Sequence, residues 1–317
     1  MDGDELMGAR LRVITDNDYS GDPDGLVQLA HLLLSPSVDV RAVIGSHLRA
    51  GDPFDSSPIT ATKARQAADV VVDLLGLTGA ITTIEGSNTA LVDRSTPIRS
   101  AAAEAIVAEA MRESDLPLYV TLGAGLTELA SAYLLEPRIA ERLTAVWIGG
   151  PEHDGLAVAP PRPGGPEVSE YNLRIDITAA QVVFDSPIPL WQVPRDAYRQ
   201  AMMSFAELET RVRPHGAIGE HLVSRLQDVV EMAAAHGFDS GEVYILGDSP
   251  LVLLTALQSS FEPDPSSSRY VTVPAPGIDD EGRYVARQSG RPIRVYTHLD
   301  VRLMLEDLVA KLARHAA

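Results

Sequence analysis

Hydrophobic residues along this chain form short unbroken runs that alternate with longer segments in which apolar positions recur with helical spacing. The short runs predict buried strands, and the longer segments predict amphipathic helices. Strand candidates lie at residues 11–15, 38–44, 118–122, 143–148, 188–193 and 243–246. Strands and helices that alternate in this way are typical of a mostly parallel sheet covered by helices on both faces.

Proline-containing pairs mark two of the predicted helix starts. Ser57-Pro58 supplies an N-cap and a proline at the first helical position, which predicts a helix through about Leu75. Thr96-Pro97 repeats this pattern before an alanine-rich helix through about Met111. Further helices are predicted at residues 26–34, between strands 118–122 and 143–148, at 198–236 with an interruption near Pro214, and at 299–313.

We therefore expect a single doubly wound α/β domain over residues 11–317, preceded by a flexible leader at residues 1–10. The segments 160–166 and 262–268 are predicted loops. No run reaches the ~18 apolar residues of a membrane span, and the acidic leader lacks the apolar stretch of a secretory signal. The chain has no cysteine, which excludes disulfides and thiolate zinc sites. These features favour a cytoplasmic protein without a membrane partner.

The charge balance narrows the choice of ligands. The chain carries 44 acidic residues against 26 lysines and arginines, a formal net charge of −18. Proteins that bind nucleic acid need clustered lysine and arginine to contact phosphates. The charge therefore argues against nucleic acid as a partner and is compatible with a bound cation.

Polar residues and glycines gather directly after the predicted strands. The first strand leads into an aspartate-rich loop, the second into Ser46 and His47, and a later one into Gly247-Asp248. In doubly wound sheets, ligands bind beyond the carboxyl ends of the strands. We expect the functional site there, where His47 could act as an acid or base or could be an ordinary loop histidine.

The aspartate-rich loop is the strongest chemical signal. Asp16, Asp18, Asp22 and Asp24 place four carboxylates within nine residues. Such crowding causes repulsion that a cation would relieve, and the oxygen ligands suit Ca²⁺. Asp24 alone could instead cap the helix that follows. The cluster as a whole predicts a divalent-cation site and favours calcium.

Four segments together resemble the nucleoside hydrolase superfamily, of the inosine-uridine type. The first is Asp-Asn-Asp after the early strand, with an aspartate that opens a helix. The others are Leu-Gly-Ala-Gly-Leu-Thr-Glu-Leu-Ala at 122–130, Ile-Gly-Gly at 148–150 with Ser-Glu-Tyr-Asn at 169–172, and Leu-Gly-Asp-Ser-Pro-Leu at 246–251. Their order and separations over residues 11–255 are similar to those of the family.

The resemblance implies calcium-dependent hydrolysis of the N-glycosidic bond of a ribonucleoside or a ribonucleoside analogue. Asp18 would be the general base that deprotonates a calcium-bound water. The implied metal ligands are Asp18, Asp24, Asp248 and the backbone carbonyl of Thr127, and Asp16 would support them from behind. Family members commonly form homo-oligomers, so the resemblance also implies a dimer or tetramer.

The resemblance further assigns the substrate-binding residues. Asp22 and Asn172 would bind the ribose hydroxyls, and Glu170 would lie near the 5′ end of the sugar. Ser46, which stands where an asparagine is usual, and the adjacent His47 are additional candidates for contact with the substrate.

Three departures from the family pattern affect these assignments. The loop after Asp18 is one residue longer, which leaves open whether Asp22 or Asp24 is the bidentate metal ligand. Gly247 replaces a histidine that protonates the leaving base in purine-cleaving members. The segment 160–166 replaces a Gly-Asn pair ahead of Glu170. We therefore expect an aglycone that is not an ordinary nucleobase or is recognised differently.

Two alternatives remain open from the sequence. The chain could bind ribosides without hydrolysing them, since its base-binding half is altered. An Asp-x-Asp motif after a strand also opens aspartate-nucleophile phosphohydrolases, which carry a downstream lysine. Lys63 and Lys311 are the only lysines, and neither follows a predicted strand, so this second alternative is disfavoured.

Overall fold

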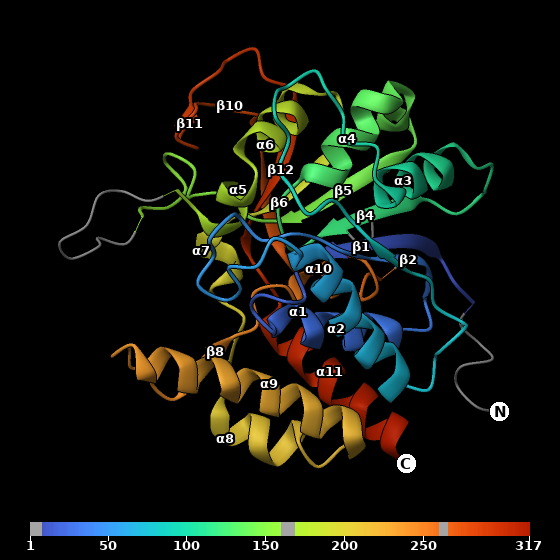
Figure 1. Cartoon of the computed structure of the whole chain (residues 1–317), viewed down its shortest axis with the longest axis vertical. Coiled ribbons are helices and arrows are strands. Elements are labelled where there is room, and N and C mark those ends of the chain that lie inside the picture. Colours follow the sequence, from blue (N-terminus) through green and yellow to red (C-terminus); the bar gives the residue numbers. More distant parts are fainter. Residues whose placement is uncertain (1–7, 160–168, 260–265) are drawn as a thin grey trace.

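A computed structural model describes residues 8–159, 169–259 and 266–317. An eight-stranded sheet forms its centre, in the order β3-β2-β1-β4-β5-β6-β12-β9 (Figure 1). The strands are β1 (Leu11–Asn17), β2 (Val38–Gly45), β3 (Thr83–Glu85), β4 (Leu118–Leu122), β5 (Leu143–Ile148), β6 (Leu190–Val193), β9 (Arg269–Pro274) and β12 (Pro292–His298). All neighbours are parallel except β9 and β12, which are antiparallel. The predicted, mostly parallel sheet is confirmed.

Helices cover both faces of the sheet (Figure 1). One face is covered by α3 (Ala101–Met111), α4 (Thr127–Leu135) and α6 (Ile177–Asp185). The other is covered by α1 (Asp24–Leu33), α2 (Thr60–Leu74) and α11 (Val301–Ala316), with α9 (Gly216–Ala235) packed outside them. Burial of apolar side chains between the sheet and each helical layer supplies the main driving force for this arrangement. The doubly wound architecture is therefore confirmed as well.

Strand β1 positions the functional residues. It is buried along its whole length and lies between β2 and β4. Asn17 at its end is level with Gly45 of β2, and Asp16 is level with Leu122 of β4. Because the chain winds away from β1 in opposite directions on its two sides, the carboxyl ends of these strands border the crevice where doubly wound folds bind ligands.

The predicted helix caps at Ser57 and Thr96 are wrong. Helix α2 begins at Thr60, without a capping side chain of its own, and its Ala61 N–H donates to Asn88 Oδ1 at 2.8 Å. Helix α3 is capped by Ser100, whose hydroxyl oxygen accepts from the Ala103 N–H at 3.0 Å. A proline marks the region of a helix start, but the donor groups are satisfied by whichever oxygen the tertiary fold brings close.

The strand predicted at 243–246 forms, but it lies outside the main sheet. As β8 (Val243–Ile245) it pairs with β7 (Met202–Ser204) in a separate antiparallel ribbon. The helix predicted over 198–236 is therefore wrong in its first part. That part contains the end of α7 (Arg195–Tyr198), then β7, the one-turn α8 (Phe205–Glu207) and a π-helical turn at Leu208–Val212.

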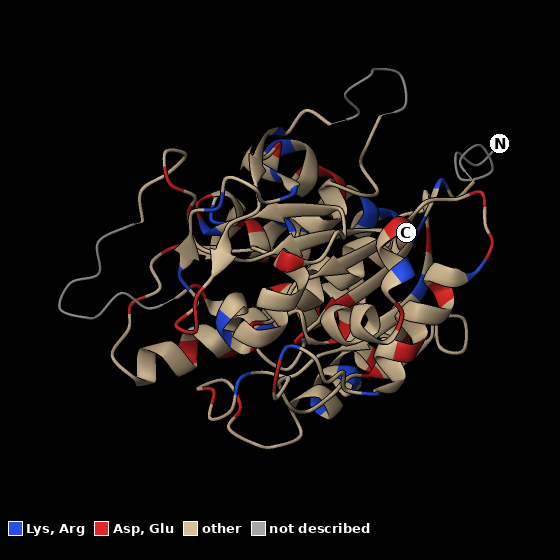
Figure 2. Cartoon of the chain, turned by 90° about the horizontal axis from the view of Figure 1, so that it is seen from above, with Lys and Arg blue, Asp and Glu red and all other residues tan. Residues whose placement is uncertain are grey.

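The remaining elements are short. They are α5 (Tyr171–Ile175), α10 (Pro250–Leu253), a 3₁₀ helix at Pro137–Glu141 and the ribbon of β10 (Gly277–Ile278) and β11 (Tyr284–Val285). The predicted loop at 160–166, most of the leader at 1–10 and part of the loop at 262–268 lie outside the described residues. No helix within the described ranges has the length and apolar character needed to cross a membrane. Acidic and basic positions are interspersed along the chain (Figure 2).

Gly45 at the end of β2 provides a test of the close packing between sheet and helix. A Cβ atom at this position would lie 2.2 Å from the Arg65 backbone nitrogen of α2. We expect Gly45→Ala to lower the free energy of unfolding by about 1–3 kcal/mol, since α2 has to move away from the sheet. Urea unfolding would measure the change. Gly8→Ala is the matched control, because nothing lies within 4 Å of a Cβ at Gly8, and equal stability of the two variants would contradict the close approach.

Candidate functional site

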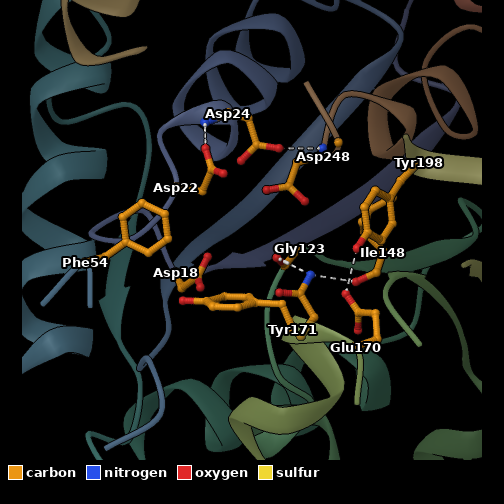
Figure 3. A pocket seen from close by; sticks show the side chains of 12 residues that line it. Asp18, Asp22, Asp24, Phe54, Gly123, Ile148, Glu170, Tyr171, Tyr198 and Asp248 are labelled. Carbon is orange, nitrogen blue, oxygen red and sulfur yellow. Dashed lines mark hydrogen bonds between the residues drawn. The ribbon is translucent and has the colours of Figure 1, made fainter. Parts of the chain in front are cut away.

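A pocket opens at the carboxyl ends of β1, β4 and β5 (Figure 3). Its lining combines carboxylates, aromatic side chains and glycines: Asp18, Asp22, Asp24, Phe54, Gly123, Ile148, Glu170, Tyr171, Asn172, Tyr198, Gly247 and Asp248. All six lining residues that carry a carboxylate or a side-chain amide belong to the set that the sequence predicted. The structure therefore brings distant segments of the chain together at the predicted edge of the sheet.

The carboxylates reach the pocket from four structural contexts. Asp18 follows β1 directly, and Asp24 is the first residue of α1. Asp248 lies in the turn between β8 and α10. Glu170 is the N-cap of α5, where its side chain accepts from the Leu173 N–H. Each sits at the end of an ordered element, so its backbone position is fixed by the fold rather than by a free loop.

The side chains of Asp22 and Asp24 accept hydrogen bonds from backbone N–H groups of other pocket aspartates, and Asp22 also accepts one from a tyrosine. Asp24 Oδ2 accepts from the Asp248 N–H at 3.0 Å. Asp22 Oδ1 accepts from the Tyr244 hydroxyl at 2.7 Å and from the Asp24 N–H at 3.3 Å. These bonds tie the loop after β1 to the β8–α10 turn, which is far away in the sequence, and they hold the carboxylates in a single group.

Asn17 is a central residue of the site that sequence reasoning missed. Its Nδ2 donates to Asp248 Oδ2 at 2.9 Å, and its Oδ1 accepts from the Asp18 N–H at 2.8 Å. A Cβ atom would lie 2.8 Å from Asn17 Nδ2 at Gly25 and 2.3 Å from it at Gly123. The two glycines therefore make room for a fully buried amide that links β1 to Asp248. An amide side chain at the end of a fully buried strand, between two aspartates, was the signal that could have revealed it.

Burial and mutual repulsion shift the acidity of this group. Burial raises the pKa of Asp18 well above its usual value, and the charges of Asp248 and Asp22 raise it further. Burial likewise raises the pKa of Asp24, with a further contribution from Asp248, and it raises the pKa of Asp248 to about 7. Asp18 Oδ2 is buried and has no hydrogen-bond partner among the described residues. A cation between these carboxylates would offset both the cost of burying their charges and the repulsion between them.

The donor chemistry of this group fits a hard divalent cation, because all the candidate ligands are oxygen atoms. The side chains do not form a ready-made ligand set, however. Among the described residues, no three His, Asp or Glu side chains have an arrangement that could hold a metal ion. One oxygen each of Asp24 and Asp248 is engaged by protein donors. Binding a cation would therefore require these side chains to turn inward.

Four predicted residues lie behind the pocket and do not line it. Ser46 Oγ donates to Asp16, which is fully buried near the end of β1. His47 Nε2 is hydrogen-bonded to Thr127 Oγ1 at 2.9 Å, and the Thr127 hydroxyl donates to Asp176 Oδ2 at 2.8 Å. Gly123, in the loop before α4, lines the pocket, whereas Thr127, the first residue of α4, does not. This network forms the support beneath the carboxylates.

Asn172 lines the pocket, and its hydrogen bonds determine which atom of its amide group is available to a ligand. Its Nδ2 donates to the carbonyl oxygens of Gly123 at 2.9 Å and Ile148 at 2.8 Å. With both amide hydrogens used by the backbone, the side chain presents its Oδ1 acceptor to a ligand. A sugar hydroxyl is a suitable donor to that atom.

Aromatic residues form the remaining walls of the pocket. Phe54 and Tyr171 pack edge to face, with ring centroids 6.3 Å apart. The Tyr198 hydroxyl donates to Glu170 Oε1 at 3.0 Å. A Cβ atom at Gly247 would meet the Tyr198 ring at 3.3 Å, so this ring occupies the space beside the glycine.

Comparisons with known proteins identify relatives in sequence and in fold. The chain is 38% identical over 79 residues to the inosine-uridine preferring nucleoside hydrolase of Crithidia fasciculata, a match that covers 25% of this chain and 22% of that protein. It is 38% identical over 93 residues to the Leishmania major enzyme of the same description, covering 29% of this chain and 27% of that protein. The matches thus span about a quarter of the length of these curated relatives.

The similarity in fold extends over nearly the whole chain. A purine-preferring ribonucleoside hydrolase from Gardnerella vaginalis superposes with a TM-score of 0.70 at 18% identity, covering 96% of this chain and 99% of that one. At this identity the similarity shows the fold. A model of the family described as inosine-uridine preferring nucleoside hydrolase matches residues 13–306. That match includes every carboxylate of the pocket, and the chain belongs to the inosine-uridine preferring nucleoside hydrolase family.

Proposed function

We propose that this chain hydrolyses the N-glycosidic bond of a ribonucleoside or a ribonucleoside analogue, in a calcium-dependent reaction with Asp18 as the general base. The observation that carries the proposal is the buried Asp18 carboxylate. It lies beside Asp24 and Asp248 in the pocket and leaves one oxygen without a protein partner. A carboxylate held in this way is available to a water molecule and a sugar.

Asp18 has the properties of a base rather than of a structural carboxylate. Burial raises its pKa, so the ionised carboxylate binds a proton more strongly than that of an exposed aspartate does. In the proposed reaction, the Asp18 carboxylate takes a proton from the water that attacks C1′ of the ribose. The Asp18 N–H bond to Asn17 keeps the residue in place during this transfer.

The sugar would be held by residues on both sides of the base. Cleavage of an N-glycoside passes through an oxocarbenium-like transition state, which nearby negative charge stabilises. In this proposal, Asn172 Oδ1 and Asp22 accept hydrogen bonds from ribose hydroxyls. Glu170 accepts from the Gly150 and Leu173 N–H groups and from Tyr198, so its carboxylate is held in place, and we assign it to the 5′ end of the sugar.

The metal-holding residues we propose are Asp18, Asp24 and Asp248. Calcium bound there would bring the ribose hydroxyls and the water together and offset the charge of the carboxylates. We favour Asp24 over Asp22 as a ligand, because Asp24 is the more deeply buried of the two. Thr127 is left out of the set, and its hydroxyl is assigned to positioning His47 and Asp176. The homo-oligomeric state and the cytoplasmic location stay predictions of the sequence.

Asp18→Asn tests the proposed base. We expect the substitution to lower kcat by roughly 10²- to 10⁴-fold, the usual contribution of a positioned general base. Release of ribose from a panel of nucleosides in the presence of calcium would be measured. Glu113→Gln removes the same charge from a side chain that is 88% exposed, and it should leave the rate unchanged.

The panel also separates hydrolysis from binding alone. If the unaltered protein released no ribose from any nucleoside, while calorimetry showed that ribosides bind, the non-catalytic alternative would replace the proposal. Activity that survives complete removal of calcium by a chelator would refute the metal requirement and leave the role of Asp18 open to the mutational test.

The raised pKa values predict a link between pH, calcium and stability. The folded pKa of Asp248 is about 7 against an ordinary value of 3.8, so the folded state binds more protons than the unfolded chain. The free energy of unfolding should therefore fall as pH rises toward and through 7. In chelator, we expect Tm to be lower at pH 8 than at pH 5 by on the order of 5 °C.

Calcium should reverse this loss, since it binds the ionised carboxylates and stabilises the folded state by mass action. The increase in Tm on adding calcium should be larger at pH 8 than at pH 5, as measured by differential scanning fluorimetry. Asp248→Asn, which removes one titrating group, should flatten the dependence on pH. A Tm in chelator that rises between pH 5 and pH 8 would contradict the assigned shifts.

A further inference from the structure

The charge of the pocket points to a particular class of substrate. Five of its lining residues carry carboxylates, and none of the described lining residues is a lysine, arginine or histidine. When all five carboxylates are ionised, the two positive charges of a calcium ion still leave three negative charges. Arg195 interacts with Glu170 from outside the lining, but its guanidinium is paired with Glu152 at 2.8 Å. The pocket is therefore a place where positive charge is stabilised.

The Tyr198 hydroxyl, on the wall of the pocket beside Glu170, is a poor proton donor to a ligand. Its hydroxyl proton is directed at Glu170 Oε1, at 3.0 Å. An ionised carboxylate only accepts hydrogen bonds, and the other oxygen of Glu170 is already occupied by the Gly150 and Leu173 N–H groups. Tyr198 therefore presents lone pairs rather than a proton to a ligand. Its ring also fills the space beside Gly247.

The aromatic wall opposite is suited to a flat cation. Phe54 and Tyr171 lie on the same side of the pocket as Asp18 (Figure 3). Their rings meet at 88°, so the ligand is offered both an aromatic face and an aromatic edge. Aromatic faces attract cations, and here the attraction would add to that of the neighbouring carboxylates.

From these contacts we propose that the preferred substrate is a riboside whose aglycone carries a formal positive charge, such as a pyridinium riboside or an N7-alkylated purine riboside. This inference rests on the proposed hydrolase function and narrows its substrate class. The negative pocket binds the charge of the aglycone, and the aromatic wall stacks on its ring.

The reaction of such a substrate balances without an acid. The C1′–N bond breaks and its electron pair moves onto the nitrogen, which cancels the positive charge of the aglycone. The water oxygen forms the new bond to C1′, and its proton passes to Asp18. The products are ribose and a neutral base, with one proton returned to solvent from Asp18. No group on the Tyr198 wall has to protonate the leaving nitrogen.

The test compares two ligands of nearly the same shape that differ by one charge. Nicotinamide riboside is cationic, and its 1,4-dihydro form is neutral. Both would be titrated by calorimetry, in the presence of saturating calcium, into the full-length Asp18→Asn protein, in which turnover is expected to be roughly 10²- to 10⁴-fold slower. We expect the cation to bind about ten-fold tighter or better at low salt, with a smaller difference in 0.5 M salt because of screening. Equal affinity for the two ligands would overturn the inference.

Asp22→Asn in the same background isolates the contribution of charge. An asparagine with its amide oxygen in the Oδ1 position keeps both hydrogen bonds that Asp22 accepts. We expect the ratio of cation to neutral affinity to fall several-fold, since one nearby negative charge is lost. The exposed Glu113→Gln variant should leave the ratio unchanged. An unchanged ratio in Asp22→Asn would show that pocket charge does not select the ligand.

Turnover by the unaltered protein separates this inference from the proposed function. Faster release of ribose from nicotinamide riboside than from inosine or uridine supports it, but the measured affinities decide, because pyridinium ribosides are also chemically more labile. Release from neutral nucleosides alone overturns the substrate class and upholds hydrolysis. Release from neither class overturns both.

Discussion

The repulsion among buried carboxylates at the end of β1 is the constraint on which the rest of the site depends. Asp18, Asp24 and Asp248 are almost fully buried within one pocket. Such a group persists only if the surrounding structure holds it and a cation or protons neutralise it. Asn17 in β1 holds Asp248 by a hydrogen bond. The positions that pack against its amide are glycines because a Cβ atom there would clash with it. The raised pKa values and the expected affinity for calcium follow from the same crowding.

The position of the site could be predicted because it depends on periodicity and topology, which are visible in a sequence. Short apolar runs gave the strands, and parallel strands bring their carboxyl ends to one edge. The aspartates after β1 and Asp248 were placed at that edge by this pattern and do line the pocket, and Glu170 and Asn172, which came from the family resemblance alone, line it too. Their assignment to individual roles came from resemblance to a family rather than from the pattern.

The rest depends on contacts between distant segments, which local sequence does not reveal. Asn88 caps a helix that begins 28 residues before it. Strands β12 and β9 are only partly buried, so they lack the apolar runs of the inner strands. Tyr198 enters the pocket only because the chain turns back after β6. His47 and Thr127 were expected at the pocket, yet they satisfy each other beneath it.

Under the proposed function, this division would allow the recognition of the leaving group to change while the sugar-binding half is kept. The carboxylates are fixed by elements of the main sheet and by bonds to backbone groups, so altering one of them disturbs β1, α1 or the turn at Asp248. Phe54 and Tyr198 lie outside the main strands. Substitutions there can reshape the wall around the aglycone without moving Asp18. A pocket built in this way can retain its bond-breaking chemistry while its preference shifts from one aglycone to another.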